Sequence, residues 1–193
     1  MLPTTRILLL RCSIAICLLT APSSALAATI WSGPMITFSK DAFADHTLAE
    51  NQDRITDAVW IARAGSMGIY NFASEDAFTS SSPADTEWAW ALSGFNVGQE
   101  IAAANFENLT FNTWFVAHGG RGDGPPSTVG IPGVLHLISD DIYIDISFTS
   151  WGEGPGSGTP FSYIRSTAVP EPSTGMLLGL GLVGLLAKRR RRS

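Results

Sequence analysis

The pattern of apolar and polar residues is most regular over residues 142–149. Three isoleucines and a phenylalanine stand at every second position, alternating with Tyr, Asp, Ser and Thr. A period of two puts these two sets on opposite faces of a β-strand. The turn formers Ser139, Asp140 and Asp141 separate this run from another β-rich run at 134–138. The pattern therefore predicts a central β-hairpin with one buried face and one wet face.

Short segments of the same kind recur between residues 28 and 168, and helical periodicity is weak. Only 101–107 and 41–50 are candidates for short helices. This distribution predicts an all-β domain, a single β-sandwich or a jelly-roll-like fold. The strands are expected at 36–40, 57–64, 68–73, 87–92, 109–115, 134–138, 142–151 and 161–167.

Apolar runs of a different kind stand at the two ends of the chain. Residues 1–27 have the layout of a secretory signal peptide: basic residues near the start, an apolar centre, and small residues at Ala25 and Ala27. Signal peptidase is expected to cut before Ala28. Both cysteines of the chain lie in the removed segment, so the exported domain contains no thiol.

The C-terminal apolar run, 175–187, holds 13 residues and would span about 20 Å as a helix. The hydrocarbon core of a bilayer is about 30 Å thick, so this segment suits a transient membrane anchor better than a permanent one. A basic run follows and is expected to stay on the cytoplasmic side. Its members are Lys188, Arg189, Arg190, Arg191 and Arg192, before the final Ser193.

An extended strip precedes the apolar run, because two prolines disfavour helix there. Its residues are Val169, Pro170, Glu171, Pro172 and Ser173. Together with the apolar and basic runs, this strip resembles a PEP-CTERM sorting signal over 169–193. The resemblance implies an exosortase, a membrane protease-transferase of Gram-negative bacteria that make extracellular polysaccharide. It implies transient anchoring in the inner membrane and delivery to the cell surface or exterior. A plain tail anchor is the alternative interpretation.

The intervening domain, 28–168, also resembles a recurrent domain of exported PEP-CTERM proteins, in the hairpin block and in "FSYIRST" and "NQDRITDAVWIARA". This resemblance implies no activity. The domain holds five basic and 16 acidic residues, a formal charge of −11. Such a charge argues against nucleic acid or anionic lipid as a partner. It is compatible with cations, neutral sugars or simple solubility.

Residues for catalysis do not assemble in the sequence. The three histidines are far apart, and HExxH and GxSxG are absent from the 193 residues. We therefore expect a non-enzymatic protein with a structural or interaction role in the exopolysaccharide layer. A glycosidase that uses two of the 16 carboxylates is a weaker alternative.

Two sets of residues are candidates for binding. In "EWAWA", Trp88 and Trp90 project to the same face of a strand, which is either a core face or a platform for a sugar. A carbohydrate-binding, lectin-like module is therefore an alternative function. Asp140, Asp141 and Asp145 surround one turn and supply the oxygen ligands that calcium prefers. Calcium-loop motif spacing is missing from the sequence, so the expectation is no cofactor, with calcium as the alternative.

Overall fold

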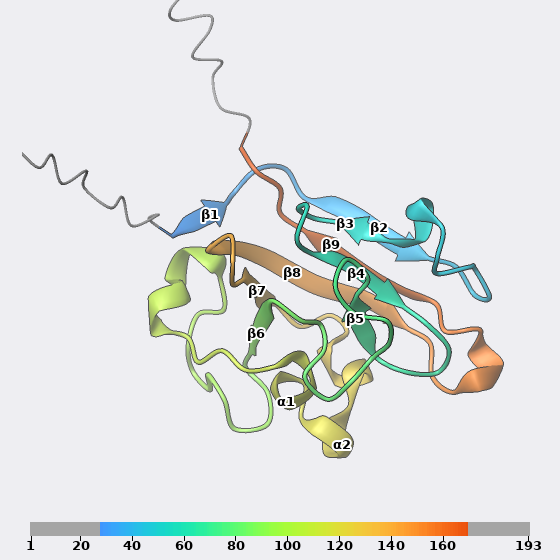
Figure 1. Ribbon diagram of the computed structural model, residues 1–193. Helices are drawn as coiled ribbons and strands as arrows, with labels where there is room; N and C mark the ends of the chain where they lie inside the picture. The colour runs from blue at the N-terminus through green and yellow to red at the C-terminus, as the bar shows by residue number, and fades with distance from the viewer. Residues whose placement is uncertain (1–27, 170–193) are drawn as a thin grey trace, which may run out of the picture.

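A computed structural model describes residues 28–169 of the chain (Figure 1). The expected signal peptide with Ala25 and Ala27, and the tail from Pro170 to Ser193, lie outside the described residues. Ala28 and Val169 are the first and last residues described. In the described part, helices are short, and none is long and apolar enough to cross a membrane.

The described residues form two sheets. In the larger, six-stranded sheet the order is β2-β9-β8-β7-β6, and β1 pairs with β8; the smaller sheet has the order β3-β4-β5. The strands are β1 (Thr29–Trp31), β2 (Ile36–Lys40), β3 (Asp53–Arg54), β4 (Trp60–Arg63), β5 (Ile69–Asn71), β6 (Thr86–Trp90), β7 (Gly133–Leu137), β8 (Ile142–Trp151) and β9 (Phe161–Arg165). The helices are α1 (Trp114–Ala117), α2 (Gly120–Asp123) and the 3-10 turns η1 (Ala49–Asn51), η2 (Ala103–Asn108), η3 (Pro125–Thr128) and η4 (Pro155–Ser157).

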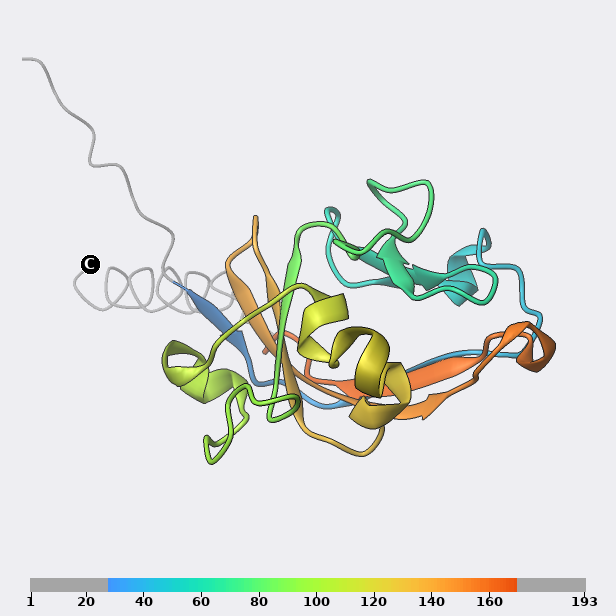
Figure 2. The ribbon, with the colours of Figure 1, turned by 90° about the horizontal axis from the view of Figure 1, so that it is seen from below.

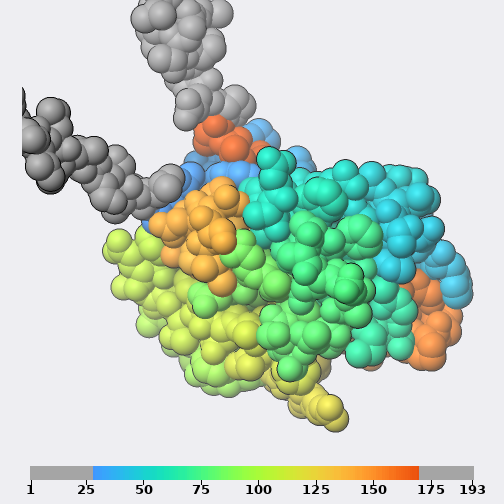
Figure 3. Space-filling model, in the orientation of Figure 1, coloured from blue at the N-terminus to red at the C-terminus, as the bar shows by residue number. Residues whose placement is uncertain are grey.

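β8 is the central strand of the larger sheet. Its first half pairs antiparallel with β7, and its second half pairs antiparallel with β9. β9 pairs with β8 only from Ile146 onward. Beside the first residues of β8, 142–144, the short strand β1 pairs in parallel instead. The two ends of the described chain therefore meet, and Gly33 N donates to Thr167 O at 2.8 Å. Figure 3 shows the blue beginning and the red-orange end side by side at the upper edge of the molecule.

The smaller sheet lies against one face of the larger sheet, as two layers in Figure 2. Ile61 and Ile69 from the smaller sheet share one apolar core with Ile144 and Phe148 from β8, and Trp114 of α1 joins them. The described residues are thus mostly β, with two sheets and short helices only. The sheets have six and three strands, whereas a jelly roll is built from eight strands in two sheets.

The hairpin formed by β7 and β8 is confirmed, with β8 running from Ile142 to Trp151 as expected. The prediction of a wet second face is only partly correct. Tyr143 on that face is buried, because η2 packs over it and the Phe106 ring stacks on it with centroids 4.0 Å apart. The loop that returns from β6 thus covers part of the outer face.

Two of the expected elements were wrong. Residues 109–115 make a single bridge, between Asn112 and Trp88, and then turn into α1. Trp114 is the buried residue of this segment, and it reaches the core from α1. The expected helix at 41–50 is a loop that ends in η1. Both errors arose where short apolar runs fit more than one kind of element.

Candidate functional site

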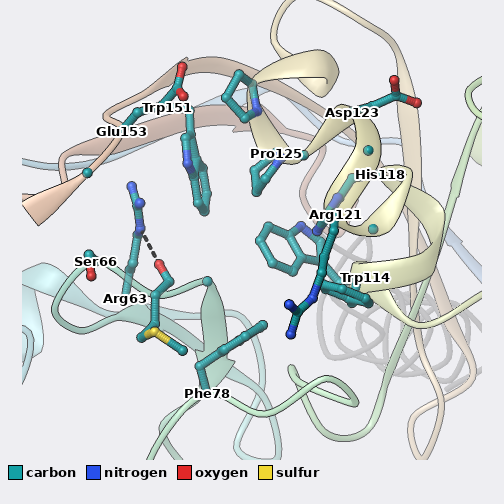
Figure 4. Close-up of a pocket in the computed structure, with 18 residues that line it drawn as sticks. Arg63, Ser66, Phe78, Trp114, His118, Arg121, Asp123, Pro125, Trp151 and Glu153 are labelled. Atoms are coloured by element: carbon teal, nitrogen blue, oxygen red, sulfur yellow. Dashed lines mark hydrogen bonds between the residues drawn. The ribbon is translucent and has the colours of Figure 1, made fainter.

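A cleft of about 370 Å³ opens where four parts of the chain meet. They are the end of β4 with its turn to β5, the β5–β6 loop, the α1–α2 segment, and the end of β8. Phe78, Trp114 and Trp151 form its aromatic wall, and Figure 4 shows their rings around one space together with Arg63 and Arg121. The volume falls within the range of small-molecule sites. We call this space the aromatic cleft.

Close packing holds the aromatic wall together. The Trp114 and Trp151 ring centroids are 5.5 Å apart, and Phe78 meets Trp114 edge-on at 6.0 Å. Gly68 makes this approach possible, because a Cβ there would lie only 2.5 Å from carbon atoms of both Phe78 and Trp114. Any larger residue at position 68 would push the two rings apart.

Arg63 lines the cleft beside Trp151, and only 2% of it is exposed. Its Nε donates to Met67 O at 2.8 Å, Nη1 to Pro160 O at 3.1 Å, and Nη2 to Gly152 O at 2.9 Å. The guanidinium carbon lies 3.7 Å from the centroid of the Trp151 ring. Within residues 28–169 no carboxylate forms an ion pair with Arg63. Burial lowers the pKa of Arg63 to about 10, so the side chain is charged at neutral pH.

The cleft also contains buried polar atoms that lack partners. His118 follows α1 and is 2% exposed, and neither of its ring nitrogens has a hydrogen-bond partner in the described part of the chain. The same holds for Nε1 of Trp114. Burial lowers the pKa of His118 to about 4, so the imidazole is neutral at neutral pH. Buried polar groups normally find partners, so these three atoms are unusual, and they lie beneath the surface of the cleft.

Charged residues stand at the rim of the cleft. Arg121 and Glu153 are exposed, and Asp123 accepts a hydrogen bond of 2.6 Å from Ser93 Oγ. Ser93 and Asp123 lie close to the backbone beside His118, but neither imidazole nitrogen bonds to them. The nucleophile–base contact that acyl transfer requires is therefore not formed among the described residues.

The structure corrects the interpretation of Trp88 and Trp90 as a platform for a sugar. Trp88 and Trp90 do project to the same face of β6, with rings stacked at 5.3 Å and 10°. That face is the core face, and the exposed fractions of the two residues are 0% and 1%. Both rings also pack against Phe148 of β8. They are therefore inaccessible to a sugar, because the smaller sheet and α1 cover this side of the larger sheet.

The carboxylates of the three calcium candidates, Asp140, Asp141 and Asp145, do not gather around one position. The Asp145 carboxylate accepts a hydrogen bond from Ala103 N at 2.6 Å, whereas Asp141 lies 3.3 Å from Nε2 of His136 at the turn. Asp140, on the same turn, has a buried oxygen without a partner among the described residues. Between residues 28 and 169 there is no group of three or more His, Cys, Asp or Glu side chains that could hold a metal ion.

Sequence reasoning missed the aromatic cleft, because its residues come from segments far apart in the chain. One signal was present in "VWIAR", where Arg63 ends an otherwise apolar strand. A charged residue at such a position is either paired or placed at a site. The sequence alone does not show that Trp114, His118 and Trp151 lie beside it.

The comparisons with known proteins concern the tail. Residues 168–192 match the PEP-CTERM protein-sorting motif, which confirms the resemblance of the C-terminus. Proteins with this motif are exported, processed by an exosortase and sorted to the cell surface. Neither a curated protein nor a solved structure matches the chain. The motif therefore gives the destination of the protein, and the activity of its domain must be inferred from the site.

Proposed function

We propose that this exosortase-sorted protein acts in the polysaccharide layer outside the cell, and that its domain binds saccharide chains without modifying them. The observation that carries this proposal is the aromatic cleft, with three aromatic rings around a space of about 370 Å³. This space favours an interaction role over a purely passive scaffold. It replaces the Trp88–Trp90 platform as the place where a sugar would bind.

The chemistry of the cleft suits a saccharide. A sugar ring has an apolar C–H face that packs on aromatic rings and an edge of hydroxyl groups that needs hydrogen bonds. Trp114 Nε1 is a donor, and the neutral ring of His118 offers one donor and one acceptor. Both are buried and unpartnered among the described residues, so a hydroxyl that enters when the side chains lining the cleft move apart would satisfy them.

Binding without catalysis is the simplest function for this arrangement. Glycosidases place two carboxyl groups across the scissile bond, with separations of about 5 to 9.5 Å. The carboxylates that line the cleft, Asp123 and Glu153, lie toward opposite ends of it in Figure 4. The Asp123 carboxylate also accepts a hydrogen bond from the Ser93 hydroxyl. These features support a binding role, and turnover of the bound saccharide would contradict it.

The test is binding of the processed, exported protein to a glycan panel and to extracellular polysaccharide of an exosortase-containing host. We expect Trp151→Ala to lower the affinity about tenfold or more, because a central aromatic contact is lost. Trp60→Ala is the matched control, since Trp60 carries a similar stack, with Arg54 at 4.1 Å, outside the cleft. Thermal unfolding checks that both variants fold. Equal loss in both variants, or no binding by the wild type, would overturn the proposal.

A further inference from the structure

Arg63 also lines a second cavity, on its other side. This cavity has a volume of about 250 Å³ and shares Arg63 and Ser66 with the aromatic cleft. The rest of its wall comes from the end of β2, the loop that follows, and the β8–β9 hairpin, including Lys40, His46 and Thr159. We call it the basic cavity. The two spaces are therefore neighbours with Arg63 between them.

Lys40 is the second buried cation of the basic cavity. It is the last residue of β2, opposite Phe161 of β9, and is 3% exposed. Among the described residues, its Nζ makes one hydrogen bond, of 3.3 Å, to Asp41 O. An ammonium group has three donors, so two N–H groups remain for another acceptor. Arg63 uses three of its five N–H groups on carbonyl oxygens and has two left.

These two cations lack a counter-ion in the described part of the chain. None of its carboxylates forms an ion pair with Lys40 or Arg63. Asp41 and Asp45 are exposed, and the Asp45 carboxylate instead accepts two hydrogen bonds from Thr47. Burial and the charge of Arg63 lower the pKa of Lys40, and the charges of Asp41 and Asp45 offset this only in part. Two like charges held out of water favour binding of an anion between them.

We infer that Lys40 and Arg63 form an anion-binding subsite, and that the saccharide is an acidic chain: the carboxylate of one sugar residue enters the basic cavity while a neighbouring sugar ring of the same chain packs in the aromatic cleft. The saccharide part rests on the proposed function, whereas the anion subsite rests on the cation pair alone. A carboxylate accepts charge-assisted hydrogen bonds from ammonium and guanidinium groups, and a sulfate substituent offers the same anionic oxygens. The ligand class is therefore a uronate-containing polysaccharide.

The experiment compares an oligogalacturonate with its methyl ester, which has the same chain without the charge. Affinities are measured for the processed, exported protein at constant ionic strength. We expect the acid to bind about tenfold more tightly than the ester. Lys40→Met should remove this preference. Arg54→Met is the matched control, because Arg54 is an exposed cation on Trp60, outside both cavities, and should keep the preference.

The outcomes separate the inference from the proposed function. If acid and ester bind equally well, the anion subsite is wrong and saccharide binding stands. If neither binds, the proposed function fails, and the subsite stands only if inorganic sulfate raises the melting temperature of the wild type and not of Lys40→Met. Tighter binding of a sulfated oligosaccharide, lost in Lys40→Met, would overturn the carboxylate assignment. Lys40→Gln replaces Lys40→Met if the latter does not fold.

Discussion

Arg165 and Arg63 are both buried, yet their charges meet different surroundings. Arg165 donates two hydrogen bonds to the Asp53 carboxylate, from Nε to Oδ2 at 2.7 Å and from Nη2 to Oδ1 at 2.8 Å. The Tyr163 hydroxyl donates to the same carboxylate at 2.7 Å. Arg63 has carbonyl oxygens and the face of Trp151 instead. The first charge is neutralised inside the fold, and the second borders two cavities.

The pKa values follow this difference. Burial lowers the pKa of Arg165, but the hydrogen bonds and charge of Asp53 outweigh burial and raise it overall. For Tyr163, whose charged form is an anion, burial raises the pKa, and the charge of Asp53 and the hydrogen bond to it raise it further. For Arg63, burial acts without such compensation and lowers the pKa to about 10. The comparison teaches that burial of a charge does not by itself identify a site: the unpaired cation beside a cavity does.

The largest effect on stability is expected from Arg165→Met. It leaves Asp53, which is 7% exposed, as a buried carboxylate without its cation. Breaking a buried ion pair by removing one partner typically costs about 3–5 kcal/mol. Urea unfolding measures the change in the free energy of unfolding. Arg54→Met, at an exposed position, is the control and should change it by less than about 1 kcal/mol.

A pH-dependent effect of nearly the same size is expected from His118 in the aromatic cleft. Its pKa in the folded protein is about 4, below the ordinary value of 6.5, because burial disfavours the charged ring. As the pH falls from 6.5 to 4, the unfolded state therefore takes up the proton first, and the folded protein loses about 3 kcal/mol of stability.

The measurement for His118 is urea unfolding of the wild type and His118→Gln at pH 7 and pH 4. The difference between the two proteins isolates the histidine from carboxylates that titrate in the same range. We expect the wild type to lose more stability than the variant on acidification. An equal loss would show that His118 is not held neutral in the fold.

Arg63→Met is expected to have a smaller effect than Arg165→Met, about 1–2 kcal/mol of lost stability. The change removes three hydrogen bonds and the contact with Trp151, but it also relieves the desolvation of a charge without a carboxylate partner and leaves no charged partner buried, so the two effects largely offset each other. Urea unfolding of the two methionine variants side by side checks the order. If Arg63→Met proves as damaging as Arg165→Met, Arg63 is a structural residue of the same kind.

Lys40→Met should change stability least. Its Nζ makes one long hydrogen bond in the described structure, and the substitution removes a buried charge that lacks a carboxylate partner there. We expect a change within about 1 kcal/mol, in either direction, because loss of that bond and relief of desolvation oppose each other. Thermal unfolding without added anion measures it. A loss above about 3 kcal/mol would indicate a structural role for Lys40.

The sequence predicted the strands best where alternation was longest. β8 lies where the pattern placed it, because one of its sides faces the core and the other faces the outside or a loop. β2 also has the expected bounds, although most of its residues are exposed. β1 was missed, since three residues are too few to show a period, and its pairing with β8 depends on a distant strand. The tail was identified because a sorting motif is a local pattern of residues.

The candidate site could not be predicted in the same way. Alternation correctly placed Trp88 and Trp90 on one face, but which face is buried depends on where the smaller sheet packs. The net charge of −11 argued against nucleic acid or anionic lipid as a partner and did not indicate a site for an anion, because it is an average over the domain. Locally, Lys40 and Arg63 are brought together from two different sheets. Tertiary packing creates this basic spot, and no short stretch of sequence contains it.

The most direct test follows the Nε–Hε signals of Arg63 and Arg165 in ¹⁵N NMR spectra while oligogalacturonate is added to the processed protein. Both side chains are buried and hydrogen-bonded through Nε, so each serves as an internal reference for the other. We expect the Arg63 signal to shift and saturate while the Arg165 signal stays in place. A static Arg63 signal at saturating ligand, or equal shifts of both signals, would contradict the assignment of Arg63 to a ligand site.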